Sequence, residues 1–299
     1  MADAAGERPA LLSRDERATP RESPDAIVAA LAESARAALV RAERSPHDIV
    51  AVGCAAPGPL DARSGIVFEA PNLAGFRDFP LAERLSAALD GAPTFVDRDT
   101  AMAAIAEGSI GAARGVRDFV YVTVSTGLGG AVVSGGRILR GQSGTAGEIG
   151  HWPVGMERGL GSVPRCGCGS HGCVEAYAAG RNLAERFGAA DAESVYAAAV
   201  RGDERARAVI AEAEAALGNL AVGLTNVFNP ALIVVGGAVA AGQSGHVLEP
   251  MRRAIAERAF RTAASAVRVV PAALGEDVGM LGAVLAARER AAGRGDRFL

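Results

Sequence analysis

Apolar side chains recur along the chain at two spacings, one typical of amphipathic helices and the other of buried strands. In the segment SPDAIVAALAESARAALVRA, Ile27, Leu31 and Leu39 fall on one face of a helix. Ser23 followed by Pro24 is typical of an N-cap and a first helical turn. The later segment IVAVGCA is continuously apolar and partly β-branched, so it predicts a buried strand that ends in the loop AAPGP.

The rest of the chain shows the same two patterns. A strand TFVD precedes the alanine-rich helix DTAMAAIAEGSIGAARG, which Gly111 and Gly115 end. A strand FVYVTV leads into STGLGG, and AVVSGGRIL continues as the second arm of a hairpin with Gly-Gly at its turn. The second half is mostly helical, with strands at 231–235 and 267–270 and a final helix at about 277–292. This alternation predicts an α/β protein with two or more layers.

The length of the chain allows two domains. A chain of 299 residues with 49% hydrophobic side chains can bury a core in each of two domains of ordinary size. A boundary near 111–115 is expected, because a glycine-ended helix there precedes a new set of strands. We expect a smaller N-terminal α/β domain at 1–113 and a larger C-terminal α/β domain at 114–282. The C-terminal helix at 283–299 is expected to pack back on the N-terminal domain.

Charge and targeting signals exclude several classes of function. The 31 basic and 34 acidic side chains give a formal charge of -3, with no long run of like charges, so no nucleic-acid partner is expected. Residues 1–20 lack the apolar segment of a signal peptide. No apolar run approaches the roughly 18 residues that span a bilayer. We therefore expect a cytoplasmic protein with no membrane partner.

The basic residues are all arginines, because the sequence contains no lysine. This composition excludes a Walker A phosphate loop, a Schiff-base lysine and the strand lysine of protein kinases. Any nucleotide site must therefore bind phosphate groups in another way.

Three of the four cysteines lie close together in the sequence. Cys166, Cys168 and Cys173 form the pattern C-x-C-x4-C among glycines, and three thiolates with one imidazole satisfy a tetrahedral zinc ion. His151 and His171 compete for the fourth position. His171 lies inside the short loop, where geometry is cramped, whereas His151 approaches from a preceding element.

The alternatives to a metal site are unliganded thiols or a redox pair. A reducing cytoplasm favours metal binding for clustered cysteines, and the spacing is C-x-C and not the C-x-x-C of redox pairs. We interpret the cluster as structural zinc with four protein ligands, a closed site that does not activate water. The isolated Cys54 is interpreted as a buried core residue.

The region around these cysteines resembles a known family. GTAGEIGH followed by CGCGSHGCVE is similar to the ROK family pattern G-x-x-G-E-x-G-H and C-x-C-G-x-x-G-C-x-E. Further matches follow the family order, and the resemblance runs from about Ser23 to Ala292. It implies the actin-like ATPase (ribonuclease H-like) fold of sugar kinases, with two α/β domains around a cleft. It also implies a zinc ion that shapes the sugar pocket and often a homodimer.

The resemblance assigns roles to individual residues around the cysteine cluster. The implied zinc ligands are His151, Cys166, Cys168 and Cys173. The implied partners of sugar hydroxyls are Glu148, His151 and Glu175, and carboxylates suit that role because they accept hydrogen bonds from vicinal hydroxyls. The 14 residues between His151 and Cys166 exceed the family spacing, so we expect the MERGLG segment to loop out near the sugar site.

Asp99 matches the family's catalytic aspartate. As a general base it would take the proton from the attacking sugar hydroxyl during transfer of the γ-phosphoryl group of ATP. The alternative is an N-cap of the helix that follows. Arg98 and Ala101 replace asparagines of the family; Arg98 would bind another hydroxyl pattern or an acidic group, or pair with Asp97 or a glutamate. Gly58 is also assigned to the substrate site.

Two glycine-rich turns are candidate nucleotide contacts, with Mg²⁺ accompanying ATP. In STGLGG, backbone N–H groups and a hydroxyl can bind a phosphate group without lysine, although glycine-rich hairpins are common. The residues assigned there are Thr126, Gly127, Gly129 and Gly130. Gly236 and Gly237 resemble the family's adenosine-side turn, and the alternative is an ordinary connection between strand and helix.

The family's first phosphate hairpin, Asp-x-Gly-Gly-Thr, does not occur in this sequence. ERPALLSRDERATP resembles a third strand whose two preceding strands are missing, through either a start downstream of the natural one or a real loss. We therefore hold two hypotheses: a hexose kinase acting on glucose or an N-acylated relative, and a catalytically weak or inactive sugar-binding relative or sensor. A repressor is disfavoured, since no helix-turn-helix segment fits before Ser23.

Overall fold

A computed structural model describes residues 1–70, 73, 75–154 and 163–295 of the chain. Contacts divide it into two compact units. Unit 1 consists of Met1–Ile110, Arg140–Ala146 and the residues from Asp277 onward, and unit 2 of Gly111–Leu139 and Gly147–Glu276. The domain division expected above, 1–113 with 283–299 and 114–282, stays a prediction.

Unit 2 is built on a five-stranded mixed sheet in the order β10-β9-β8-β11-β12. Strands β8, β11 and β12 are parallel, whereas β9 pairs antiparallel with β8, and β10 pairs antiparallel with β9 at the edge of the sheet. The strands are β8 (Phe119–Val124), β9 (Leu128–Ser134), β10 (Arg137–Ile138), β11 (Leu232–Gly236) and β12 (Arg268–Pro271). The predicted hairpin is formed by β8 and β9, and its turn lies at residues 125–127. Gly135 and Gly136, both with positive φ, form a second turn between β9 and β10.

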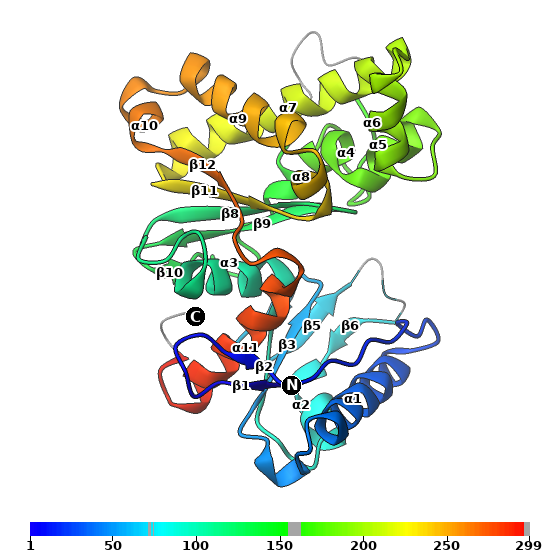
Figure 1. The fold of residues 1–299 in the computed structure, drawn as a ribbon, viewed down its shortest axis with the longest axis vertical. Helices are drawn as coiled ribbons and strands as arrows, with labels where there is room; N and C mark the ends of the chain where they lie inside the picture. Colours follow the sequence, from blue (N-terminus) through cyan, green and yellow to red (C-terminus); the bar gives the residue numbers. More distant parts are fainter. Residues whose placement is uncertain (71–72, 74, 155–162, 296–299) are drawn as a thin grey trace. The chain divides into compact units, whose positions relative to one another are not determined.

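Helices cover this sheet. The long helices α7 and α9 lie side by side on one of its faces (Figure 1). The helices and 3-10 turns of unit 2 are η2 (Ile149–His151), α4 (Val174–Ala178), α5 (Gly180–Phe187), α6 (Ala192–Val200), α7 (Glu204–Phe228), α8 (Ala238–Gly242), α9 (Ser244–Arg258) and α10 (Arg261–Ala266). Val120, Val122 and Ile233 of the central strands are fully buried in the core of this unit. This burial explains why β8 and β11 are continuous apolar runs without alternation.

Helix α7 is long and apolar enough to cross a membrane, and it is the one helix among the described residues with that length and composition. Its side chains Leu217, Leu220 and Leu224 are buried in the core of unit 2. Core helices of globular proteins often have this length and composition, so these two properties alone are weak evidence for a membrane span.

Unit 1 combines small sheets with four helices among its described residues. The elements are β1 (Ala2–Asp3), β2 (Ala10–Leu11), α1 (Pro24–Arg41), η1 (Pro46–Asp48), β3 (Val52–Ala56), β4 (Leu60–Asp61), β5 (Ile66–Glu69), β6 (Arg77–Phe79), α2 (Leu81–Ala88), β7 (Thr94–Arg98), α3 (Asp99–Ile110) and α11 (Val278–Ala291). The 3-10 turn η3 (Gly275–Asp277) precedes α11 and spans the boundary in sequence between unit 2 and unit 1. β3 pairs with β7 in parallel, and β4-β5-β6 form an antiparallel sheet. The core contains Ile27 and Val28 of α1, Leu85 of α2 and Val96 of β7.

Two glycines let α11 approach its neighbours in unit 1 closely. A Cβ atom on Gly53 of β3 would lie 2.0 Å from the carbonyl oxygen of Ala283. A Cβ atom on Gly282 would lie 1.8 Å from the carbonyl oxygen of Met102 in α3. Any larger side chain at these positions would force α11 away from β3 or α3.

The predicted helix from Ser23 is confirmed, because the Ser23 side chain accepts a hydrogen bond from the Ala26 N–H at the start of α1. The prediction of a buried strand at IVAVGCA is correct for the strand and wrong for its burial. Within β3 only Ala56 is buried, and Cys54 is half-buried against the core of unit 1. β3 has β7 as its single strand partner among the described residues, which leaves its other edge less covered.

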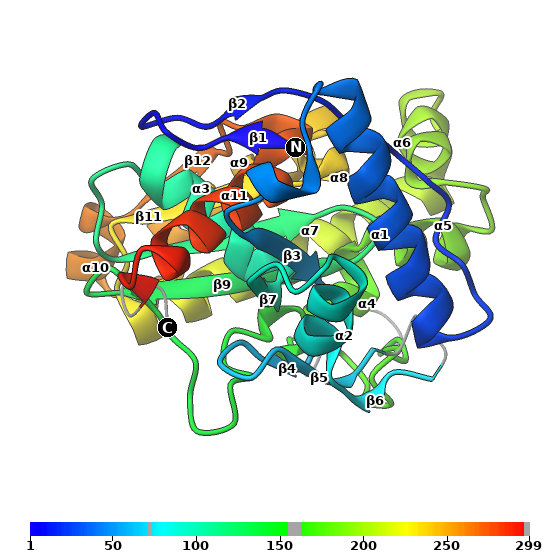
Figure 2. The same cartoon turned by 90° about the horizontal axis from the view of Figure 1, so that it is seen from below.

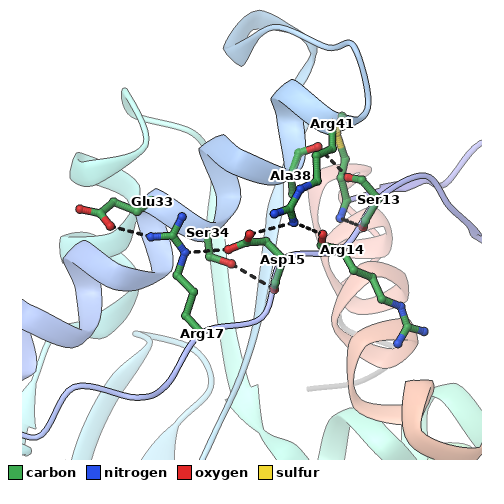
Figure 3. A network of polar contacts seen from close by, with 9 residues as sticks. Ser13, Arg14, Asp15, Arg17, Glu33, Ser34, Ala38 and Arg41 are labelled. Carbon is green, nitrogen blue, oxygen red and sulfur yellow. Dashed lines mark hydrogen bonds and ion pairs between the residues drawn. The ribbon is translucent and has the colours of Figure 1, made fainter.

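The segment ERPALLSRDERATP, predicted as a strand, is extended only briefly at Ala10–Leu11, which pair with β1. Its remainder runs alongside α1 (Figure 2). Side chains make this attachment, as Figure 3 shows: the Ser13 hydroxyl donates to the Ala38 carbonyl at 2.6 Å, and Arg41 pairs with Asp15 at 2.8 Å. These side-chain bonds take the place of a strand ladder over residues 13–17.

Candidate functional site

A cluster of one histidine and three cysteines lies in unit 2. The ligand atoms of His151, Cys166, Cys168 and Cys173 all lie within 4.8 Å of one another. The Cys168 and Cys173 sulfurs are 3.8 Å apart, and Cys166 Sγ is 3.5 Å from His151 Nδ1. Sulfurs at the corners of a zinc tetrahedron with Zn–S bonds of ~2.3 Å are about 3.8 Å apart. The spacing of these side chains fits a single tetrahedral ion.

A tight turn brings the cysteines together. The Cys166 N–H donates to the Ser170 carbonyl at 2.8 Å, and the Gly169 N–H donates to the Cys166 carbonyl at 3.0 Å. Gly169 has a φ of +91°, a left-handed conformation that few other residues adopt. His171 pairs with Arg165 across this turn and lies outside the cluster. Of the two histidines that competed for the fourth position, the structure brings His151 to the cysteines.

The chemistry of the cluster also calls for a cation. Burial raises the pKa of the Cys166 thiol to about 12 and raises the pKa of Cys173 as well. Ionisation of these two buried thiols is therefore unfavourable at neutral pH unless a cation offsets their charge. The donor set of three sulfurs and one imidazole nitrogen is the one that zinc prefers.

Glu175 connects the cluster to the STGLGG hairpin. Its Oε2 accepts the Leu128 N–H at 3.1 Å, and its Oε1 lies 3.8 Å from Cys166 Sγ. A Cβ atom on Gly127 would lie 3.3 Å from the same Oε2, so glycine leaves room for the carboxylate. One side chain of α4 thus contacts both the cysteine cluster and the hairpin between β8 and β9.

The STGLGG turn has an exposed tip and a buried base. Thr126 and Gly127 are exposed, whereas Gly129 is half-buried and Gly130 buried. A Cβ atom on Gly130 would lie 2.4 Å from the carbonyl oxygen of Tyr121. Gly130 is therefore required for packing, and the tip at Thr126 and Gly127 has the exposed groups able to meet a phosphate.

The second glycine turn lies at the same edge of the sheet. Gly236 at the end of β11 pairs in register with Thr123 near the end of β8. Gly237 has a φ of +96°, and a Cβ atom there would lie 2.4 Å from the carbonyl oxygen of Val124. The structure therefore brings both predicted nucleotide turns to the carboxyl edge of two parallel strands, where α/β sheets commonly bind ligands.

The GEIGH motif packs against the start of β9. A Cβ atom on Gly150 would lie 1.9 Å from the Leu128 carbonyl oxygen, so only glycine allows this contact. The motif places exposed Glu148 at the N-cap of η2 and His151 at its end. The MERGLG segment, expected to loop out beyond His151, lies outside the described residues.

In unit 1, Asp99 is the first residue of α3 and directly follows β7. Its side chain is exposed, and its Oδ1 accepts the N–H of Thr100 at 2.6 Å. The carboxylate is thus at the junction of strand and helix where the sequence predicted it. Its role as a base or a cap stays a prediction.

Arg98 and Gly58, both assigned to the substrate site, lie together. Arg98 is 2% exposed, and its Nη2 donates to the Ala146 carbonyl at 2.6 Å. A Cβ atom on Gly58 would lie 3.0 Å from Arg98 Cδ, so glycine gives the arginine stem room to pass. A role for Arg98 in sugar binding stays a prediction.

Sequence reasoning missed a buried ionic cluster next to Arg98. Asp97 is fully buried and accepts two hydrogen bonds from Arg140, at 2.7 and 2.5 Å. The Arg290 guanidinium lies 3.8 Å from the same carboxylate. Arg140 and Arg290 come from distant parts of the sequence, and neither lies in a motif that would have indicated this contact.

Comparison with known proteins gives a family for the chain. The ROK family model matches residues 3–290. A glucokinase of Halalkalibacterium halodurans is 33% identical over 259 residues, covering 80% of this chain and 76% of that protein. An N-acetylmannosamine kinase of Escherichia coli is 35% identical over 283 residues, covering 92% of this chain and 90% of that protein.

Solved structures resemble the chain as well. A ROK family glucokinase from Streptomyces griseus, determined in complex with glucose and AMPPNP, has a TM-score of 0.74 and 30% identity. The match covers 95% of this chain and 93% of that one. The predicted actin-like α/β fold is confirmed by this likeness.

Proposed function

We propose that this chain, a sugar kinase that belongs to the ROK family, transfers the γ-phosphoryl group of Mg-ATP to glucose or an N-acylated hexosamine. The observation that carries the proposal is the side chain of Glu175, which joins the histidine and cysteine cluster to the STGLGG hairpin. A carboxylate suited to sugar hydroxyls is thereby held next to a turn suited to phosphate. The relatives support the two acceptor classes, since one is named a glucokinase and the other an N-acetylmannosamine kinase.

Asp99 is the proposed general base. Its exposed carboxylate would take the proton of the attacking hydroxyl as the phosphoryl group moves. Glu148, His151 and Glu175 are the proposed partners of the sugar hydroxyls, and they select a sugar by the pattern of donors it presents.

The exposed N–H groups and hydroxyl at Thr126 and Gly127, with the turn at Gly236 and Gly237, are the proposed contacts of ATP. The chain has no lysine to offset phosphate charge. Mg²⁺ therefore supplies that charge in our proposal, together with backbone dipoles of the turns. A metal ion held by His151, Cys166, Cys168 and Cys173 would fix the fold of the sugar-binding segment without entering the chemistry.

A cytoplasmic location and a homodimer are further parts of the proposal. Both are carried over from the resemblance to the ROK family. Sedimentation analysis of the purified protein checks the homodimer: a mass near twice 30.3 kDa is expected.

A panel of sugars tests the proposed function. Purified protein with Mg-ATP is incubated with glucose, mannose, N-acetylglucosamine and N-acetylmannosamine, and ADP release is measured beside direct detection of the sugar phosphate. We expect turnover on at least one sugar. Binding of a sugar by calorimetry without any turnover would contradict the kinase and favour the sugar-binding relative or sensor. No binding and no turnover across the panel would contradict both.

A further inference from the structure

We propose that Asp97 and Arg98, the last two residues of β7, act as a clamp that holds both ends of the segment Arg140–Ala146 and so positions Glu148. The inference rests on the proposed function, in which Glu148 binds sugar hydroxyls and Asp99 is the base. Neither residue of the clamp need touch the sugar; both act as positioning residues.

The first end of the segment is held by a buried ion pair. Two Arg140 nitrogens donate to the two oxygens of Asp97, at 2.7 and 2.5 Å, in the paired geometry that guanidinium and carboxylate favour. The Asp97 side chain is fully buried, and that of Arg140 is 15% exposed. Such a pair fixes both the position and the orientation of Arg140, because water does not compete for the carboxylate.

The second end is held by the neighbouring side chain. Arg98 Nη2 donates to the Ala146 carbonyl oxygen at 2.6 Å, and the arginine is 2% exposed. The Ala146 N–H donates in turn to the Arg140 carbonyl at 3.0 Å, which closes the segment into a loop. Within that loop, a Cβ atom on Gly144 would lie 3.3 Å from the Leu60 carbonyl oxygen, so the loop also packs on β4.

The clamp lies next to two proposed functional residues along the chain. Asp99 directly follows Arg98, and Glu148 is the second residue after Ala146. The clamp is therefore adjacent in sequence to the start of α3, and the segment that it holds ends one residue before the GEIGH motif. Arginine has the reach for this bond, because its long stem passes over Gly58 to the Ala146 carbonyl. A loosened segment would let Glu148 sample positions that no longer match the sugar hydroxyls.

The principal test substitutes Arg98 by methionine, which keeps the length of the stem and removes the donor. Hydrogen exchange of the peptide spanning 140–148 is measured in the protein without ligands, and we expect at least tenfold faster exchange there. Arg117→Met is the matched control, since Arg117 also donates to a loop carbonyl, that of Gly135 at 2.8 Å, away from both motifs. Unchanged exchange in Arg98→Met would overturn the clamp.

Kinetics test the effect on Glu148. We expect Arg98→Met to raise the sugar KM at least tenfold with kcat within threefold, and to leave the ATP KM unchanged. In a Glu148→Gln background the same change should raise the sugar KM less than threefold, because the group being positioned is already altered. Additive effects of the two substitutions, or a fall in kcat with unchanged sugar KM, would show that Arg98 does not act through Glu148.

Arg98→Lys is a second variant that keeps the test decisive if Arg98→Met does not fold. Lysine can still donate to a carbonyl, so we expect it to recover part of the exchange protection and of the sugar affinity. A lysine variant no better than methionine would contradict the hydrogen bond as the cause. If the wild-type protein shows no turnover, the proposed function fails, while exchange of 140–148 still decides whether the clamp exists.

Discussion

At Asp99 the two possible roles lead to different results when the carboxylate becomes an amide. Asparagine caps a helix about as well as aspartate does, so Asp99→Asn leaves a cap intact while it removes a base. We expect kcat to fall ~10²–10⁴-fold, with the melting temperature and sugar affinity unchanged. Steady-state kinetics and sugar calorimetry measure the two effects separately.

The control for this substitution is Asp203→Asn. Asp203 caps α7, where its side chain accepts the Ala206 N–H at 3.0 Å, and it has no proposed part in the reaction. It should retain full activity. Retention of most of kcat in Asp99→Asn would leave Asp99 as a structural residue at the start of α3.

Single residues also show what the sequence could and could not predict about the site. His151 and the three cysteines were predictable, because a metal restricts residue types and spacing. The Arg98 contact was not, since its partner is a backbone carbonyl at position 146 that carries no side-chain signal. The partner of Asp97 could not be predicted either. Arg98 is the nearest cation in sequence, but Arg140 donates to both oxygens of the Asp97 carboxylate.

At the scale of elements, α11 offers a matched pair of glycines. Gly282→Ala should destabilise the protein by ~1–3 kcal/mol or more, because its Cβ would lie 1.8 Å from the Met102 carbonyl in α3. Gly279 lies in the same helix with nothing within 4 Å of its would-be Cβ. Gly279→Ala should stabilise by about 0.5–1 kcal/mol. Urea unfolding of both variants measures the difference, and equal effects would contradict the close approach of α11 to α3.

Elements differed in how well the sequence predicted them. Helix α1 and strand β8 were predictable because a long periodic or continuous apolar pattern and a capping serine mark them. The short strands β4, β5 and β6 went unpredicted, since two to four residues carry too little pattern and pairing with each other defines them. Burial of β3 was overestimated because an apolar run does not reveal how many strands will flank it.

For the molecule as a whole, metal binding and folding are expected to be coupled. We predict about one zinc per chain, and we expect Cys168→Ser to lower both metal content and sugar affinity because the segment around the cluster loosens. Elemental analysis and sugar calorimetry measure these quantities. Cys54→Ala is the control, since Cys54 packs in unit 1 outside the cluster and should leave the metal content unchanged. A zinc-free wild-type protein that binds sugar normally would contradict the prediction.

The two oxygens of Glu175 have a consequence for how ligands influence each other. One oxygen accepts the N–H of Leu128 in the STGLGG turn, which is proposed to bind ATP, and the other faces Cys166 of the cluster. If loss of the metal weakens the binding of ATP, thermodynamic linkage requires that bound ATP strengthen the binding of the metal by the same factor. The dissociation constant of an ATP analogue with and without chelator, and that of zinc with and without the analogue, should therefore change in equal ratio. Glu175→Ala should abolish both changes together, so that each ligand binds as though the other were absent.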